Sequence, residues 1–236
     1  MQAHPLQYYL TAPQPCPYLP GREMQAVLVD PAARAPTGHY GRLLVEGFRR
    51  SGRLVYRHQC PCCSACVPVR IPVHEFRPGR GQRRCLRRNA DLHLRQVLRP
   101  NLDEHLALFR RYLDARHPGG GMDDTTRDDY ADMISDRHCG VLLLEHRLGS
   151  ELLAVAVTDV TAHGLSAMYS FFAPDRPARS LGTYAILSQI AEARRLGIAH
   201  LYLGYWIAGS EKMAYKTRFR PIEGRVNGAW RPIAMP

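Results

Sequence analysis

The chain has 236 residues, with 32 Lys and Arg against 21 Asp and Glu, so its formal net charge is +11 and its isoelectric point is near 9.6. This length allows one large domain or two small ones, and 45% hydrophobic with 22% charged residues excludes a disordered chain. The longest apolar runs are too short to cross a bilayer, and the first residues lack the basic and apolar stretches of a secretory signal.

The positive charge is concentrated in two arginine clusters in the N-terminal half. One covers residues 49–57 and the other residues 70–99, whereas residues 100–165 are close to balanced. Segregated positive charge favours a polyanionic partner such as nucleic acid, bound through its phosphates. The alternative is a GC-rich genome that raises the arginine content of any solvated surface. Only two of the basic residues are lysines, Lys212 and Lys216, four positions apart.

The N-terminal part predicts short elements around a group of cysteines. Alternating and helical spacings of apolar residues indicate, in chain order, a strand over 24–29, a helix over 40–48, a strand over 67–73 and a helix over 79–90. Two prolines place the strand over 67–73 at a sheet edge or a bulge. We expect residues 1–78 to form an N-terminal cysteine-containing module and residues 79–236 a second domain.

The C-terminal part predicts helices followed by a sheet. The expected elements are helices over 102–116 and 125–137, strands over 141–145, 151–160 and 164–172, a helix over 181–195 and a strand over 200–205. Three antiparallel strands, a helix that crosses back and a further strand give a mixed sheet, so the predicted fold class is α+β.

Three regularly spaced cysteines, Cys60, Cys63 and Cys66, lie in one turn-rich stretch. In a reducing compartment such thiolates favour metal or cluster ligation over disulfides. A closed structural site needs a fourth ligand, for which Cys16 in a proline-flanked loop is the best candidate. Zinc and an iron–sulfur cluster both suit thiolates, and the spacing does not separate them. The alternative is a group of reduced thiols. The substitutes for the fourth position are Cys62 and His58.

A polar loop joins the strand over 164–172 to the helix over 181–195. Backbone N–H groups at the start of that helix, around Ser180, Gly182 and Thr183, predict an anion site. The alternative is an ordinary helix start with Ser180 as the N-cap residue.

Residues 201–216 place aromatic side chains beside Lys212 and Lys216. Aromatic rings stack on a base and compact ammonium groups contact phosphates, so this segment favours a nucleotide end as its ligand. The alternative is a packed aromatic strand with lysines on the surface.

These motifs together resemble those of the arginyl- and leucyl-tRNA–protein transferases, in order and over nearly the whole chain. The resemblance rests on Cys16-Pro17-Tyr18-Leu19, residues 47–52, the Cys60/Cys63/Cys66 run with Pro68-Val69-Arg70, and residues 76–84, 180–183, 202–207 and 212–221. The leucyl-transferring bacterial branch is the most similar. The chain departs from the eukaryotic branch at Leu19, where that branch carries a second cysteine, and this bears on the metal centre.

The resemblance implies an acetyltransferase-like fold in which leucyl-tRNA replaces acyl-CoA. It implies transfer of leucine to proteins that begin with Asp or Glu, which marks them for N-degron degradation in the cytoplasm, with no membrane partner. No cofactor is required for the transfer itself. Rival interpretations are an arginyl-tRNA donor, an acyl-CoA N-acetyltransferase, and a non-catalytic, metal-containing RNA-binding protein.

An aminoacyl ester is already activated, so we expect positioning of the two substrates to dominate catalysis. Arginines of the 70–84 segment are expected to bind the acidic first side chain of the acceptor protein. The candidate catalytic residues are Tyr205, Asp175 and Glu211. The candidate substrate-binding residues are Arg70, Arg80, Gln82, Arg83, Tyr169, Ser180, Gly182, Thr183, Tyr202, Lys212, Tyr215 and Lys216. For Asp175 and Glu211 the alternative is a surface or capping carboxylate.

Overall fold

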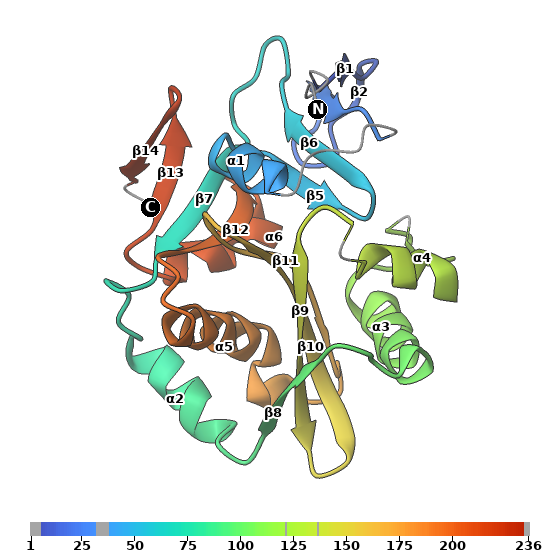
Figure 1. Ribbon diagram of the computed structural model, residues 1–236, viewed down its shortest axis with the longest axis vertical. Helices are drawn as coiled ribbons and strands as arrows, with labels where there is room; N and C mark the ends of the chain where they lie inside the picture. The colour runs from blue at the N-terminus through green and yellow to red at the C-terminus, as the bar shows by residue number, and fades with distance from the viewer. Residues whose placement is uncertain (1–5, 32–37, 121, 136, 234–236) are drawn as a thin grey trace.

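A mixed sheet of eight strands forms the centre of the protein (Figure 1). The computed structural model describes residues 6–31, 38–120, 122–135 and 137–233. In spatial order the strands are β14 (Ala229–Pro232), β13 (Glu223–Val226), β7 (Val67–Pro72), β12 (His200–Trp206), β11 (Gly164–Phe172), β10 (Glu151–Thr161), β9 (Gly140–Leu148) and β8 (His93–Val97). Strands β11 and β12 run parallel, and the other neighbours are antiparallel. The predicted mixed α+β class is therefore confirmed.

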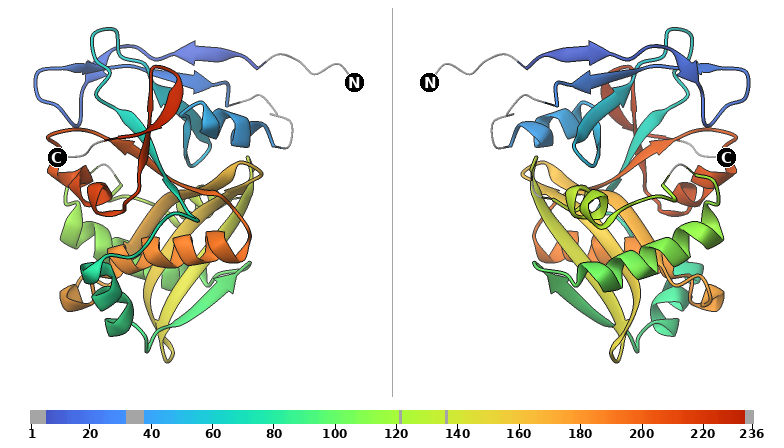
Figure 2. Two further views of the ribbon diagram at one scale, coloured as in Figure 1. Left: turned by 90° about the vertical axis from the view of Figure 1, so that its left-hand side faces the viewer. Right: turned by 90° about the vertical axis from the view of Figure 1, so that its right-hand side faces the viewer.

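Helices cover both faces of this sheet (Figure 2). On one face α5 (Leu181–Arg195) packs on β10 and β11, with α2 (Arg80–Arg88) packed against α5. On the other face α3 (Leu102–Arg116) packs on the same two strands, with α4 (Arg127–Met133) beside it. A strand covered on both faces has no solvent side, which explains the unbroken apolar run over 152–157, all of it buried.

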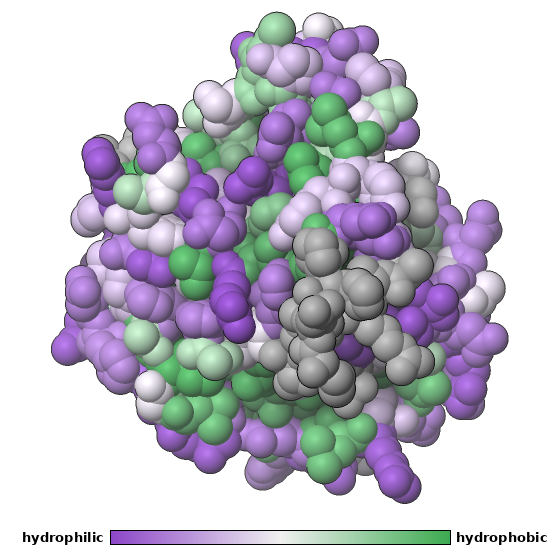
Figure 3. Space-filling model, turned by 45° about the horizontal axis from the view of Figure 1, so that its top comes forward, coloured by the Kyte–Doolittle hydropathy of each residue, from purple (hydrophilic) through white to green (hydrophobic). Residues whose placement is uncertain are grey.

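The N-terminal residues form a smaller sheet at one end of the molecule (Figures 1 and 2). Its order is β1 (Tyr8–Leu10), β4 (Ala26–Val29), β6 (Leu54–His58) and β5 (Arg49–Ser51), and it is accompanied by α1 (His39–Val45) and the pair β2 (Gln14–Pro15) and β3 (Glu23–Met24). A buried ion pair between Arg50 and Asp159, 2.5 Å apart, ties this sheet to β10. With the top turned forward, the surface is mostly hydrophilic, with smaller hydrophobic areas (Figure 3).

The predicted elements are recovered best where the apolar pattern is long. The helices over 102–116 and 181–195 and the strand over 164–172 have the predicted bounds. The helix predicted over 125–137 spans only Arg127–Met133, and residue 136 lies outside the described residues. Strands β8, β13 and β14 were not predicted, because each is short and has at most one buried residue.

Of the two placements predicted for β7, the sheet edge is wrong, because this strand lies inside the sheet between β13 and β12, whereas the bulge fits the register shift in its pairing with β12. Its prolines are tolerated there because β13 pairs with it only at Val69 and Arg70. A register shift between Tyr202 and Gly204 interrupts the pairing on the other side. The division at residue 78 stays a prediction, and β7, on its N-terminal side, belongs to the large sheet.

The remaining elements are α6 (Glu211–Ala214) and two short 3₁₀ helices, η1 (Pro177–Arg179) and η2 (Tyr215–Arg218). Within the described part of the chain, no helix has the length and apolar composition needed to cross a membrane.

Candidate active site and anion-binding cavity

The two parallel strands separate soon after they begin. Strands β11 and β12 pair only at Leu165 with Leu201 and at Ser166 with Tyr202. Beyond these pairs β12 follows β7, with Gly204 in a left-handed conformation at φ 77° next to the register shift. Tyr169 of β11 and Tyr205 of β12 therefore belong to diverging strands, and the candidate site forms around these ends.

Tyr205 is buried beneath the N-terminal sheet. Its hydroxyl donates to the carbonyl oxygen of Gly47 at 2.9 Å and accepts from the backbone N–H of His58 at 3.3 Å. The rings of Tyr205 and His58 are 4.8 Å apart, and the Arg49 guanidinium lies 5.9 Å from the Tyr205 ring centre. Burial raises the pKa of Tyr205. The hydroxyl is thus protonated and already engaged with the backbone.

The two lysines occupy different environments, although they are four residues apart. Lys216 in η2 is 4% exposed, and its Nζ donates to the carbonyl oxygen of Tyr205. Burial, aided by the nearby Arg49 guanidinium, holds the pKa of Lys216 well below its usual value. Lys212 in α6 is exposed and lies close enough to His117 to contribute to the lowering of the pKa of that histidine by burial. The change from α to 3₁₀ geometry between them separates the two side chains.

An aromatic group lies between the end of α3 and the end of β11. The ring of Tyr112 is 4.9 Å from Phe172 and 6.5 Å from Tyr169, and its hydroxyl is 3.3 Å from His117 Nε2. Tyr215, at the start of η2, is 43% exposed. Rings of this kind offer stacking surfaces for a base.

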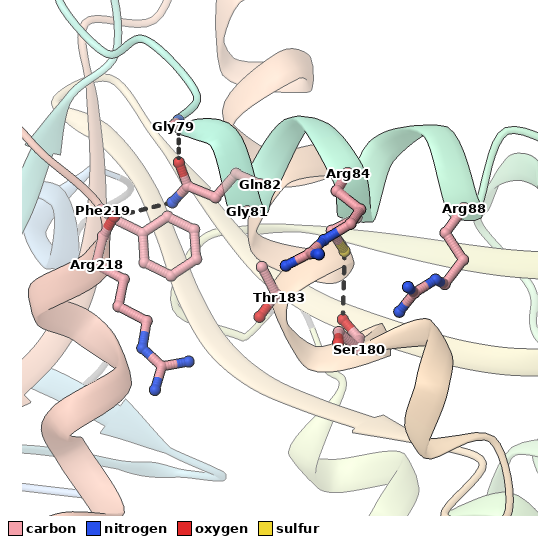
Figure 4. A pocket seen from close by; sticks show the side chains of 10 residues that line it. Gly79, Gly81, Gln82, Arg84, Arg88, Ser180, Thr183, Arg218 and Phe219 are labelled. Atoms are coloured by element: carbon pink, nitrogen blue, oxygen red, sulfur yellow. Dashed lines mark hydrogen bonds between the residues drawn. The ribbon is translucent and has the colours of Figure 1, made fainter.

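A cavity of about 620 Å³ lies between α2, the start of α5 and η2 (Figure 4). Arg84 and Arg88 extend from α2, and Arg218 comes from the opposite wall (Figure 4). Within the described residues, the side chains of Arg84 and Arg218 have no ion pair or hydrogen bond, so both are available to an anion. The lining residues are Gly79, Gly81, Gln82, Arg84, Cys85, Arg88, Ser180, Thr183, Arg218 and Phe219.

Gln82 fixes the wall of this cavity. Its Oε1 accepts from the N–H of Gly79 at 2.8 Å, and its Nε2 donates to the carbonyl oxygen of Arg218 at 2.9 Å. Ser180 occupies the N-cap position of α5 with φ 53°, but its side chain makes no capping hydrogen bond. The Ser180 side chain therefore does not cap α5. Because Ser180 and Thr183 line the cavity, backbone N–H groups at the start of this helix are left for a ligand.

Several predicted site residues have partners within the protein. Arg70 pairs with Glu223 at 2.7 Å and donates to the Tyr202 hydroxyl at 3.2 Å. Asp175 pairs with Arg111 at 2.8 Å on an exposed surface. The other members of the predicted set lie as follows: Arg80 is exposed on α2, Arg83 donates to the Pro78 carbonyl, Gly182 packs on Phe172, and Glu211 is exposed at the start of α6.

The four predicted metal ligands lie in one region of the N-terminal sheet. Burial raises the pKa of the Cys66 thiol to about 12, and Cys60, Cys16 and Cys63 add to this shift, so the four thiols are neighbours. In the part of the chain that the structure describes, no three His, Cys, Asp or Glu side chains are arranged to hold a metal ion. The donor set suits zinc or an iron–sulfur cluster, because thiolates are the ligands that both prefer.

Charge alone does not distinguish Arg49, Arg88 and Arg218 from the other arginines, so the sequence did not single them out. Arg84 was included only as one of the arginines of the 70–84 segment, which were expected to bind the acceptor protein. The one available signal for Arg49 was its place in residues 47–52, one of the segments that carried the family resemblance.

The split sheet and the arginine-lined cavity fit an acyl transferase whose carrier is a polyanion. Residues 14–84 match the family described as "Arginine-tRNA-protein transferase, N terminus", and residues 104–225 match its C terminus. The chain belongs to the arginine-tRNA-protein transferase family. The predicted family is therefore confirmed.

Relatives with the name aspartate/glutamate leucyltransferase align along almost the whole chain. The relative from Nitrosococcus oceani is 50% identical over 224 residues, 94% of each chain. The relative from Parvibaculum lavamentivorans is 48% identical and covers 95% of this chain and 94% of its own. The relative from Pseudomonas aeruginosa is 48% identical, with 95% and 96% covered. These names carry the activity that the sequence resemblance implies.

A solved structure of L-PGS from Bacillus licheniformis shares the fold. It superposes with a TM-score of 0.51 at 12% sequence identity and covers 71% of this chain and 58% of that chain. At this identity the likeness concerns the fold alone.

Proposed function

We propose that this protein transfers leucine from leucyl-tRNA to the α-amine of proteins that begin with Asp or Glu, in the cytoplasm, as a mark for degradation. The amine nitrogen attacks the ester carbonyl, the bond to the ribose oxygen of the tRNA breaks, and that oxygen takes up a proton. Identity near 50% with three aspartate/glutamate leucyltransferases supports this proposal. The split mixed sheet supports an acetyltransferase-like arrangement with tRNA in place of acyl-CoA.

The observation that carries the proposal is the cavity between α2, α5 and η2. A tRNA 3′ end brings several phosphates, and Arg84 and Arg218 are unpaired in the described chain and face this space. Two further donors are the uncapped start of α5 and the side chain of Thr183. Arg80 and Arg83, on the same helix, would extend the positive surface toward the rest of the tRNA.

The leucyl-adenosine end would lie against the aromatic group of Tyr112, Tyr169 and Phe172, with Tyr215 and Lys212 beside it. Stacking of a base on an aromatic side chain contributes about 1–3 kcal/mol. The exposed position of Tyr215 supports this role, because a ring that stacks on a ligand must be accessible.

Proton transfer is a smaller requirement than positioning. An α-amine with a pKa of about 7.7–8.0 is roughly one tenth neutral at pH 7. A general base adds about 10²–10⁴ in rate, whereas positioning supplies roughly 7–11 kcal/mol. Of the two candidate carboxylates, Glu211 is the better base because Asp175 is held by Arg111. Tyr205, with its hydroxyl bonded to Gly47, would hold the walls of the site.

We also propose that Cys16, Cys60, Cys63 and Cys66 bind zinc or an iron–sulfur cluster that stabilises the N-terminal sheet. The mutual proximity of the thiols supports this role. A bound cation would favour the thiolate forms that burial disfavours.

A transfer assay tests the proposal. Purified protein is incubated with charged leucyl-tRNA, charged arginyl-tRNA or acetyl-CoA, and with peptides that begin with Asp, Glu, Asn or Lys. We expect a new peptide bond only from leucyl-tRNA to the Asp and Glu peptides. Transfer from arginyl-tRNA or acetyl-CoA would show that leucyl-tRNA is not the donor. Binding of tRNA without transfer to any peptide would overturn the enzymatic function.

A further inference from the structure

Two cations lie together at the end of β12 without a carboxylate partner. Arg49 begins β5 and Lys216 lies in η2, and each contacts Tyr205. Within the described residues neither side chain forms an ion pair, whereas the adjacent Arg50 pairs with Asp159 at 2.5 Å. The groups that raise the pKa of Arg49 are four tyrosines and no carboxylate. Within the described residues the protein therefore places two basic side chains here and no carboxylate beside them.

Two basic side chains that are buried together are less stable without a bound anion than with one. Lys216 is 4% exposed, and burial of an ammonium group beside a guanidinium group is unfavourable unless an anion joins them. The guanidinium lies against the backbone of Gly204, because a Cβ at this position would overlap it. An anion bound between Arg49 and Lys216 would contact the guanidinium that lies against Gly204 of β12.

A third polar side chain without a hydrogen-bond partner in the described residues lies beside Tyr205. His58 lies next to Tyr205, and both of its ring nitrogens lack a hydrogen-bond partner in the described residues. Arg49, Tyr56 and His58 are each half-buried. A ligand with both a carboxylate and a neighbouring polar group would satisfy the two cations and the histidine together.

The same short helix connects this place with the cavity. Lys216 of η2 contacts Tyr205, and Arg218, two residues later, lines the cavity assigned to the tRNA 3′ end. A ligand at Arg49 and Lys216 would thus lie next to the ester that the tRNA presents. The second substrate of the transfer has to lie at that position.

We propose that Arg49 and Lys216 together bind the side-chain carboxylate of the N-terminal Asp or Glu of the acceptor protein. This inference rests on the proposed function and assigns the acidic specificity to a pair other than Arg70, which Glu223 already holds. Arg49 offers a planar pair of donors and Lys216 a point charge, so an amide in place of the carboxylate loses both charge-assisted contacts.

The test is steady-state kinetics with the full chain, leucyl-tRNA and a pair of peptides that differ only in Asp or Asn at the first position. Arg49→Gln and Lys216→Met should each lower kcat/KM for the Asp peptide by about 10- to 100-fold, because each removes a charge-assisted hydrogen bond. The preference for Asp over Asn should fall by a similar factor, and the KM for leucyl-tRNA should not change. Arg53→Gln, which removes an exposed arginine of the same region, is the matched control and should keep the wild-type preference.

Two conservative variants keep the test decisive if Arg49→Gln or Lys216→Met fails to fold. Arg49→Lys retains the charge without the planar donor pair, and Lys216→Arg retains charge and donors. Both should keep part of the preference for Asp over Asn, with a raised KM for the Asp peptide only.

A raised KM for leucyl-tRNA with an unchanged preference would overturn the proposal, because the pair would then bind a tRNA phosphate. Transfer by the wild type with an unchanged preference in every variant would overturn the carboxylate site and leave the proposed function intact. No transfer by the wild type would instead overturn the proposed function.

Discussion

The guanidinium group of Arg49 lies directly against the backbone of Gly204, in the space that a side chain at this position would fill. The contact joins β5 of the small sheet to β12 of the large sheet. It occurs where β12 changes register against β7 and where Gly204 has a positive φ of 77°. The irregular pairing of β12 in the large sheet therefore creates the space that the Arg49 guanidinium of the small sheet occupies.

Gly204→Ala should destabilise the protein through both effects. A left-handed conformation costs a non-glycine residue about 1–2 kcal/mol. The added Cβ would also displace the Arg49 guanidinium, which is the far end of a flexible side chain, so this second cost is the smaller one. Gly209→Ala is the matched control, because Gly209 also has a positive φ of 80° but has no atom within 4 Å of the added Cβ. Urea unfolding of both variants should show a larger loss for Gly204→Ala, and equal losses would contradict the contact.

Long periodic segments made most of the large sheet predictable, whereas the site depended on tertiary contacts. The helices over 102–116 and 181–195 follow from one apolar face each. The interior position of β7 could not be predicted in this way, because the prolines in the sequence do not reveal that β13 pairs with β7 at only two residues. Lys212 and Lys216 illustrate the same limit, since their separation depends on a change of helix type that the sequence does not mark.

The predicted cysteine site gives a measurable metal content. If Cys16, Cys60, Cys63 and Cys66 bind a metal, protein prepared without oxygen should contain zinc or iron in stoichiometric amount. Cys60→Ser should lose this metal and unfold at a lower temperature, because structural metal binding adds to folding free energy. Cys85→Ser is the control, since Cys85 lies buried beside the carbonyl oxygens of Arg179 and Ser180. Metal-free wild type from both aerobic and anaerobic preparations would exclude the site.

His146 should make the protein sensitive to mild acid. Burial lowers the pKa of His146 from 6.5 to about 4, and its Nε2 contacts Ser188 Oγ at 2.8 Å. Because the folded pKa lies below the unfolded pKa, the unfolded state binds the proton more readily between these values. Stability should therefore fall as the pH drops from 6.5 toward 4, with a loss of about 2 kcal/mol at pH 5 from this group.

The comparison of wild type with His146→Gln isolates this contribution. The free energy of unfolding of the variant should fall less between pH 7 and pH 5 than that of the wild type. His163→Gln, at an exposed histidine, should retain the wild-type pH dependence. Equal pH dependence in the wild type and His146→Gln would show that His146 is not the responsible group.

Arg84 and Arg218 should govern the affinity for tRNA without affecting the acceptor peptide. Both line the cavity and have no ion pair in the described chain, so each is free to neutralise one phosphate. Removal of one phosphate contact lowers the magnitude of the slope of log K against log salt by about 0.7–0.9. Arg84→Gln and Arg218→Gln should each show this smaller slope and a raised KM for leucyl-tRNA, with an unchanged KM for the Asp peptide.

Arg110→Gln on α3, across the sheet from the cavity, is the matched loss of one positive charge and should keep the wild-type slope. An unchanged slope in both cavity variants would mean that the tRNA phosphates bind elsewhere on the protein.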